Sequence, residues 1–229
     1  MRPTLPHLFA VLAVLPAALA IACGSAGAAV KIPDPKENVA LAASPARDTA
    51  VFAGGCFWGI QAVFQHVKGV ISATSGYAGG AMKDPTYERV SDGDTGYAES
   101  VEVIYDPSQV TYGQLLKVFF SVAHDPTELN HQGPDWGTQY RSAIFFNGAT
   151  QEKLAKSYIA QLGEAKAYPK PIVTQVAPLT KFYAAEGYHQ DYLNKHPTQP
   201  YIVINDIPKV EALKAQLPEL YVPTSAATS

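Results

Sequence analysis

The sequence predicts an α+β protein, more specifically a ferredoxin-like two-layer α/β plait with a βαββαβ core and an appended helix and strand. Apolar residues recur with strand spacing in four segments and with helical spacing in two segments between them, in the order strand-helix-strand-strand-helix-strand. The 229 residues are 47% hydrophobic and 16% charged, which is typical of a globular protein. A net charge of −3 offers no basic surface for nucleic acid, so we expect a small-molecule or protein partner.

The first half of the core contains two strands and the helix between them. The segment "TAVFAGG" (49–55) is a short apolar run that ends in glycines and is predicted to be a strand. The helix predicted next, over 57–67, has apolar side chains at helical spacing: Phe57, Ile60, Val63, Phe64 and Val67. The segment "GVISATSGYAGG" (69–80) is the second predicted strand, and a polar loop over 79–97 follows it.

The second half repeats the alternation. "AESVEVIYDP" (98–107) is predicted to be the third strand. Thr111 is predicted to cap a helix whose apolar residues are Leu115, Leu116, Val118, Phe119 and Val122. A loop over 124–139 leads into the fourth strand, "YRSAIFF" (140–146). The appended helix (about 150–165) and the appended strand "PIVTQVAPL" (171–179) come last.

The N-terminus differs in composition from the rest of the chain. Arg2 precedes a run that carries no charge until Lys31, which is typical of a secretory signal peptide (1–22). Cys23 follows "LAIA", similar to a lipoprotein cleavage site, so we expect an exported protein, periplasmic or tethered to the membrane through a lipid. An uncleaved membrane anchor is the alternative interpretation.

The other expected boundaries follow from composition. Residues 23–48 are rich in Ala, Pro, Gly and Ser without apolar periodicity, which predicts a flexible linker. We expect the catalytic domain over 49–206 and a C-terminal extension and tail over 207–229.

Cys56, in "AGGCFWGIQ", is the strongest candidate for a functional residue. At the first turn of a helix, free N–H groups would lower the pKa of its thiol and favour the nucleophilic thiolate. The alternative is a buried, inert cysteine. Gly54, Gly55 and Gly59 favour the nucleophile because they let a ligand approach the backbone closely.

In the plait, the end of the first strand and the starts of the third and fourth strands share one edge of the sheet. Cys56, Glu99 and Tyr140 lie at these strand ends, and Tyr87 and Asp135 lie in the adjacent loops. Glu99 alternates with apolar residues, so its carboxyl is expected to be desolvated, protonated and able to donate a proton, unless it points to water at a frayed strand end.

The remaining candidates at this edge are aromatic or polar. Phe57 and Trp58 are consecutive on a helix, so they point in different directions, and at least one is expected to line a cleft suited to a methyl group. Tyr87 and Tyr140 have hydroxyls that can donate to a polarised oxygen. Asp135 either anchors a substrate amide or caps its turn.

Other motifs are incomplete. Ile60 and Gln61 stand where a phosphate-binding loop needs Lys and Ser/Thr, and no dinucleotide fingerprint opens the helix. One core cysteine excludes a multi-thiolate zinc site. A Cys/His hydrolase that uses His124 or His131 stays open, as does a non-catalytic binding module.

Five segments together resemble the peptide methionine sulfoxide reductase A family over residues 50–205. They are "GGCFWG", "GYAGG", "DPTYERVSDGDTGYAESVEVIYDP", "FFSVAHDPTELNHQGPDWGTQYRSAIF" and "AEGYHQDYL". The resemblance implies reduction of methionine S-sulfoxide, free or in proteins, without a bound cofactor or metal, by a monomeric enzyme that repairs oxidised proteins. It implies the following roles: Cys56 is the nucleophile, Glu99 the acid, Tyr87 and Tyr140 bind the oxygen, Phe57 and Trp58 bind the methyl group, and Asp135 positions the substrate.

The chain departs from the family pattern in two ways. Tyr97 and Trp136 stand where many members have histidine, which predicts a changed pocket polarity. No cysteine follows Cys56, although many members have a resolving cysteine there. Cys23 is the only internal alternative, but lipidation would consume its thiol and cleavage beyond it would remove the residue. An external thiol, a thioredoxin-like protein or a small dithiol, is therefore expected to regenerate Cys56.

Overall fold

The computed structural model describes residues 30–223. The expected signal peptide, Cys23 and the last six residues of the expected tail lie outside this range. No helix within the described range is long and apolar enough to cross a membrane.

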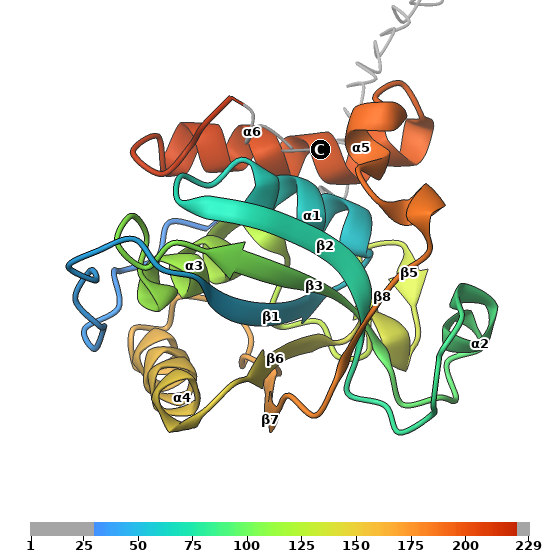
Figure 1. The fold of residues 1–229 in the computed structure, drawn as a ribbon, viewed down its shortest axis with the longest axis horizontal. Coiled ribbons are helices and arrows are strands. Elements are labelled where there is room, and N and C mark those ends of the chain that lie inside the picture. The colour runs from blue at the N-terminus through green and yellow to red at the C-terminus, as the bar shows by residue number, and fades with distance from the viewer. Residues whose placement is uncertain (1–29, 224–229) are drawn as a thin grey trace, which may run out of the picture.

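The centre of the molecule is a curled six-stranded mixed sheet with the strand order β7-β6-β1-β3-β2-β8 (Figure 1). Its strands are β1 (Asp48–Gly54), β2 (Val70–Ala78), β3 (Ala98–Tyr105), β6 (Ser142–Phe146), β7 (Gln175–Pro178) and β8 (Phe182–Ala184). Neighbouring strands are antiparallel except β6 and β7, which are parallel. The strands β4 (His131–Gln132) and β5 (Asp135–Trp136) form a separate two-stranded hairpin.

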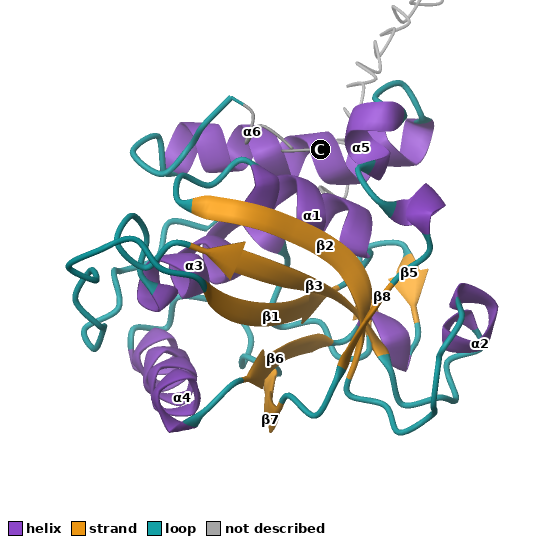
Figure 2. Ribbon diagram, in the orientation of Figure 1, coloured by secondary structure: helices purple, strands orange, loops and turns teal. Residues whose placement is uncertain are grey.

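Helices surround the sheet (Figure 2). They are α1 (Phe57–Gln65), α2 (Tyr87–Ser91), α3 (Tyr112–Val118), α4 (Ala149–Glu164), α5 (Tyr192–Lys195) and α6 (Ile207–Gln216). Helix α1 packs against β2 and β3, and α6 packs on α1 from the outside. Thr111 caps α3 as predicted, through a capping box with Gln114, and a π-helical turn (Phe119–Ala123) continues the helix. A second π-helical turn (Ile202–Asp206) leads into α6.

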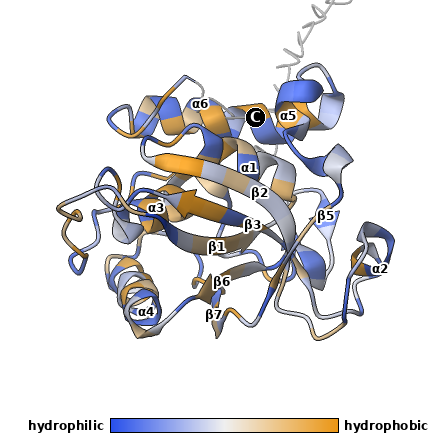
Figure 3. Ribbon diagram, in the orientation of Figure 1, coloured by the Kyte–Doolittle hydropathy of each residue, from blue (hydrophilic) through white to orange (hydrophobic). Residues whose placement is uncertain are grey.

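The main core lies between the sheet and the helices α1 and α3. The ring of Phe52 on β1 is stacked between Phe64 of α1 and Phe119, with ring centroids 5.0 Å from each. Helix α4 has one buried apolar face, which includes Leu154 and Leu162, and Figure 3 shows the alternation of hydrophobic and hydrophilic residues along it. Aromatic rings thus fill the contact of β1 with α1 and the first π-helical turn, and aliphatic side chains contribute to that of α4.

The mixed α/β class is confirmed, and all four core strands form, as β1, β2, β3 and β6. The appended helix is α4 and the appended strand is β7. β8 was not predicted, because its three residues carry no strand pattern and are held by pairing with the edge of β2. The finer assignment to a ferredoxin-like plait stays a prediction.

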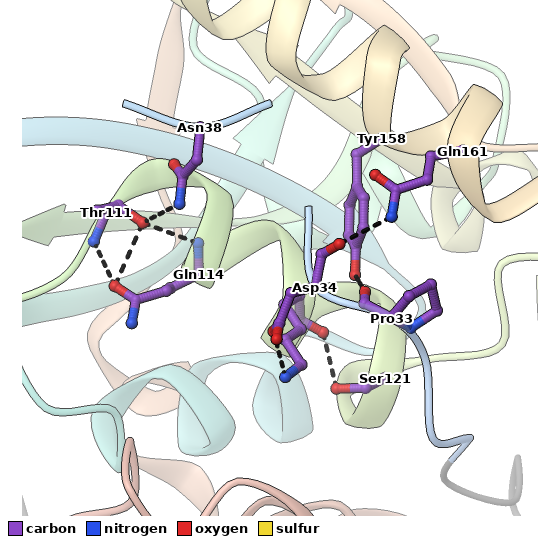
Figure 4. A network of polar contacts seen from close by, with 9 residues as sticks. Pro33, Asp34, Asn38, Thr111, Gln114, Ser121, Tyr158 and Gln161 are labelled. Atoms are coloured by element: carbon purple, nitrogen blue, oxygen red, sulfur yellow. Dashed lines mark hydrogen bonds and ion pairs between the residues drawn. The ribbon is translucent and has the colours of Figure 1, made fainter. Parts of the chain in front are cut away.

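The expectation of a flexible linker is wrong for residues 30–47, here called the N-terminal segment. The segment forms no helix or strand before Asp48, yet Ile32 is buried in the main core. Figure 4 shows its polar contacts with α3 and α4. The Tyr158 hydroxyl donates to the carbonyl of Pro33 at 2.7 Å, and Asn38 Nδ2 donates to Thr111 Oγ1 at 2.8 Å.

Further contacts hold the same segment. Gln161 of α4 donates through Nε2 to the Asp34 carbonyl at 2.7 Å and accepts from the Lys36 N–H at 2.8 Å. Lys117 Nζ lies 2.6 Å from Asp34 Oδ1. Composition predicted a linker because this segment is held by single side chains of distant helices, which leave no periodic pattern in its own sequence.

The expected domain end at Asp206 is also too early. Leu213, Leu217 and Leu220 are buried in the main core, and the ring of Tyr221 stacks on His66 at the end of α1. The folded unit therefore includes α6 and the residues that follow it up to Tyr221.

Tyr158→Phe tests whether the N-terminal segment stabilises the fold. The variant keeps the buried ring but leaves the Pro33 carbonyl without its donor, so the free energy of unfolding should fall by about 1 kcal/mol in urea denaturation. Tyr221→Phe is the matched control, because the Tyr221 hydroxyl makes no hydrogen bond within the described residues. An equal loss in both variants would contradict a stabilising role for the Tyr158–Pro33 contact.

Candidate active site

Cys56 lies at the junction of β1 and α1. Gly55 has a φ of +96°, and a Cβ there would lie 2.5 Å from the Gln132 side chain, so this turn requires glycine. Cys56 is the N-cap of α1, one residue before the helix, and is 8% exposed. Its sulfur is therefore at the helix end, as predicted, but largely removed from water.

Glu99 lies directly beside this turn. It is the second residue of β3 and only 3% exposed, which excludes the alternative of a frayed strand end. Its Oε2 accepts a hydrogen bond from the backbone N–H of Phe57 at 3.0 Å. One of the free N–H groups at the start of α1 thus holds the carboxyl next to Cys56.

Burial raises the pKa of Glu99 to about 8, although the Phe57 N–H opposes the shift. The carboxyl is consequently protonated at neutral pH, as the sequence predicted. A protonated carboxyl is a proton donor and places no charge beside the sulfur.

The expected low pKa of the Cys56 thiol is wrong. Burial raises its pKa well above the ordinary value, and the neighbouring carboxyls of Glu99 and Asp206 act in the same direction when they are ionised. A hydrogen bond from the Trp58 N–H and the charge of Lys209 oppose the shift without reversing it. The effect of the helix end on the pKa was overestimated, because the sequence did not show how deeply the sulfur is buried.

Tyr87 and Tyr140 are both brought to Cys56 and Glu99. Tyr87 begins α2, and Tyr140 ends a short 3₁₀ turn (Thr138–Tyr140) before β6. Burial raises the pKa of both hydroxyls, and Glu99 and Cys56 raise it further when they are ionised. Both hydroxyls therefore keep their protons and remain hydrogen-bond donors at neutral pH.

Phe57 and Trp58 point in different directions, as predicted. Phe57 is 1% exposed and packs in the core, with its ring 6.0 Å from that of Tyr77. Trp58 is partly exposed and stacks on Tyr192 at 3.7 Å with an interplanar angle of 8°. Both rings also contact His189, which accepts a 3.2 Å hydrogen bond from Trp58 Nε1.

A cavity opens beside Cys56. Its lining residues are Cys56, Gln132, Gly133, Pro134, Asp135, Tyr201, Asn205 and Lys209. Asp135 belongs to β5 and accepts a hydrogen bond from the hydroxyl of Tyr201. The aspartate thus reaches the cavity that the cysteine lines.

The structure adds residues that the sequence analysis did not assign. All lie in the C-terminal part of the chain: Glu186, His189, Tyr192, Tyr201, Asp206 and Lys209. Glu186 holds α2 in place, because Oε1 accepts from the Tyr87 N–H at 2.9 Å and Oε2 from the Tyr77 hydroxyl at 2.8 Å. The segment "AEGYHQDYL" signalled the first three of these through the family resemblance, but no local pattern gave them a role.

The two histidines proposed for a hydrolase have other partners. His124 Nε2 lies 2.7 Å from Ser142 Oγ and Nδ1 lies 3.0 Å from the Phe119 carbonyl, and burial lowers its pKa to about 4. His131 stacks on Trp136 with ring centroids 4.4 Å apart. Within the described residues neither histidine hydrogen-bonds to Cys56, so this geometry does not support a Cys/His pair.

Three further expectations are changed. Gly59 does not admit a ligand, because the Asp206 side chain fills the space beside it. Tyr97 is buried, and its hydroxyl donates to the Met82 carbonyl at 2.5 Å. Trp136 is 73% exposed on the β4–β5 hairpin. Neither Tyr97 nor Trp136 lines the Cys56 cavity, so the expected change of pocket polarity is not supported.

The described residues contain no group of three His, Cys, Asp or Glu side chains placed to hold a metal ion. The site offers a thiol that lines a small cavity, with a protonated carboxyl and two phenol donors close to that thiol.

Comparisons with known proteins agree with this geometry. The model of the family "Peptide methionine sulfoxide reductase" matches residues 48–220. The chain is 64% identical over 179 residues to "Peptide methionine sulfoxide reductase MsrA 2" of Mesorhizobium japonicum, covering 78% of this chain and 92% of that one. It is 49% identical over 187 residues to its namesake in Synechocystis, covering 81% and 87%.

Two solved structures are similar. Reduced Mxr1 from Saccharomyces cerevisiae is 36% identical with a TM-score of 0.60, covering 72% of this chain and 92% of that one. Methionine sulfoxide reductase A of Corynebacterium diphtheriae is also 36% identical, with a TM-score of 0.59, covering 75% and 86%.

Glu99→Gln tests the buried, protonated carboxyl. The folded-state pKa of about 8 exceeds the ordinary value of 4.5, so the unfolded chain releases its proton first as the pH rises. As the pH rises between those two values, this group therefore makes the free energy of unfolding fall by up to about 1.4 kcal/mol per pH unit. In urea denaturation at several pH values, Glu99→Gln should lose this dependence of the free energy of unfolding on pH. Glu88→Gln, which changes an exposed carboxyl, should keep it. An unchanged slope in Glu99→Gln would contradict the high pKa.

Proposed function

The chain belongs to the peptide methionine sulfoxide reductase A family, and we propose that it reduces methionine S-sulfoxide, free or in proteins, through Cys56. The observation that carries the proposal is a protonated carboxyl beside a buried thiol. The Phe57 N–H donates a hydrogen bond to Glu99 at 3.0 Å and so holds the carboxyl next to Cys56. The family is one of oxidoreductases, and Cys56 is the redox-active group that the cavity exposes.

In the proposed reaction, the Cys56 sulfur attacks the sulfoxide sulfur while the Glu99 carboxyl gives its proton to the sulfoxide oxygen. The S–O bond of the substrate breaks and the oxygen passes to Cys56. Methionine leaves reduced by two electrons, and Cys56 is left as a sulfenic acid, oxidised by two electrons. The proton that the thiol gave up on ionisation restores the Glu99 carboxyl, so atoms and charge balance.

The other residues of the site position the substrate in this proposal. The hydroxyls of Tyr87 and Tyr140 donate to the sulfoxide oxygen as negative charge develops on it. Phe57 and Trp58 provide apolar surface for the methyl group, and Asp135 holds the substrate backbone. Support comes from the convergence of the two tyrosines on Glu99 and Cys56, and from the cavity that Asp135 and Cys56 line together.

Regeneration requires thiols from outside the chain. The first thiol attacks the sulfenic sulfur, and water leaves as a mixed disulfide forms. A second thiol then releases the Cys56 thiolate and an external disulfide. Because no cysteine follows Cys56 in the sequence, we propose a thioredoxin-like protein or a small dithiol as the donor. We also propose that the enzyme needs no bound cofactor, since thiols supply the electrons.

The setting of the enzyme is also proposed. We propose a monomer, and the uncharged run after Arg2 supports its export to the periplasm or its attachment to the membrane through Cys23. The central strand order β6-β1-β3-β2, with antiparallel neighbours, supports treating the core as a ferredoxin-like plait whose one edge carries the site.

Purified residues 24–229 with methionine S-sulfoxide and dithiothreitol should release methionine, and the R epimer should not react. Cys56→Ser should abolish the release, and Glu99→Gln should slow it by about 10²- to 10⁴-fold, the usual contribution of a general acid. Methionine can be quantified by chromatography. Normal turnover by Cys56→Ser would refute the mechanism, whereas no methionine release by the wild-type protein would leave the binding-module interpretation.

His124→Asn and His131→Asn separate this mechanism from hydrolysis. A sulfoxide reductase should keep its activity in both variants, because neither ring bonds to Cys56. Loss of methionine release in the folded His131→Asn variant, whose ring lies on the exposed hairpin, would favour a role for histidine in the chemistry.

Trapping after one turnover tests the external reductant. In the mature protein, without added thiol, a sulfenic-acid reagent should label Cys56, and mass spectrometry should find no Cys23–Cys56 disulfide. A stable disulfide between the two cysteines would show that Cys23 is a resolving thiol.

A further inference from the structure

Asp206 and Lys209 form an ion pair at the start of α6. The Asp206 side chain is 0% exposed, and Lys209 Nζ lies 3.2 Å from its Oδ1. A buried carboxylate is costly unless a cation or hydrogen bonds compensate it. The pair was absent from the expected site residues because the fold brings it to Cys56 from 150 residues further along the chain.

Gly59 provides the space for this pair. A Cβ at Gly59 would lie 2.1 Å from Asp206 Oδ1 and 2.9 Å from Lys209 Nζ, so any larger residue would displace both groups. Gly59 is the third residue of α1, which begins directly after Cys56. The ion pair is therefore packed against the first turn of the helix that Cys56 caps.

Lys209 also reaches the cavity beside Cys56. It is the only cationic side chain among the described residues that line this cavity. Other ionisable groups interact electrostatically with Cys56 or line its cavity. They come from β3, α2, the β4–β5 hairpin, the 3₁₀ turn before β6 and the C-terminal part of the chain. These groups are Glu99, Tyr87, Asp135, Tyr140, Tyr201 and Asp206. All of these are acids or phenols, and none can supply a positive charge.

We propose that Lys209, positioned over Gly59 by Asp206, is the cation that stabilises the Cys56 thiolate when it attacks the sulfoxide and when it leaves the mixed disulfide. This inference rests on the proposed function. The opposite effects of the two partners support it, because the charge of Lys209 lowers the pKa of the thiol and that of Asp206 raises it. Asp206 Oδ2 has no hydrogen-bond partner within the described residues, so the ion pair through Oδ1 holds the carboxylate.

The test is the rate of Cys56 alkylation by iodoacetamide as a function of pH, followed by mass spectrometry of the Cys56 peptide. Only the thiolate reacts, so the midpoint of the curve reports its ionisation. Lys209→Met should move the midpoint to higher pH by about one unit, a tenfold lower rate at neutral pH. Asp206→Asn removes the opposing charge but keeps an Oδ1 that can accept from Lys209 Nζ, so it should move the midpoint to lower pH.

Three variants complete the design. Lys209→Gln keeps a donor toward Asp206 without the charge and should behave like Lys209→Met, which covers the case that the methionine variant does not fold. Lys209→Arg keeps the charge and should move the midpoint less than either. Lys214→Met removes an exposed lysine from the same helix and should leave the curve unchanged. Near-ultraviolet circular dichroism checks that each variant is folded.

Shifts of opposite sign in Lys209→Gln and Asp206→Asn would support the proposal, because general loosening of the site would move both curves in one direction. An unchanged midpoint in folded Lys209→Gln, or shifts of the same sign in both variants, would overturn it. A wild-type enzyme that releases no methionine would instead refute the proposed function, and the alkylation curves would still decide the role of Lys209.

Discussion

The hydrogen bond from the Phe57 N–H to Glu99 Oε2 is the contact on which the rest of the site depends. It joins the first residue of α1 to the second residue of β3, so the helix that Cys56 caps cannot shift along the sheet without losing it. It also uses an N–H group that would otherwise be unpaired at the helix end. The same contact therefore fixes the helix start, the direction of the carboxyl and its place beside the sulfur.

Burial explains why Cys56 and Glu99 are both uncharged before the reaction. Removing a thiol and a carboxyl from water favours the uncharged form of both, and neighbouring acids strengthen the effect on Cys56. Glu99 is thereby kept as an acid, which suits proton donation to oxygen. The same burial makes the thiolate costly, so a nearby cation is the compensation that the chemistry requires, and Lys209 is the cation that lines the cavity.

The two ends of the described chain have different roles. The C-terminal part of the chain brings Glu186 to the start of α2, Tyr192 to Trp58 and the Asp206–Lys209 pair to Gly59. The N-terminal segment makes hydrogen bonds with α3 and α4 (Figure 4), and none of its residues lines the cavity. We infer that the C-terminal part sets the local environment of Cys56, whereas the N-terminal segment contributes to the stability of the fold.

The sequence by itself determined the α/β class, the four core strands and the cap at Thr111, because strand and helix periodicity and capping are local properties. The expected grouping of Cys56, Glu99, Tyr87, Tyr140 and Asp135 came instead from the predicted order of the strands in a plait. The tertiary structure decided what is not local. The depth of Cys56, which reversed its expected pKa shift, the occupation of the space at Gly59 and the attachment of residues 30–47 all depend on contacts between distant segments. Desolvation and ion pairing are set by all the groups that surround an atom, and a single segment of sequence does not specify its neighbours.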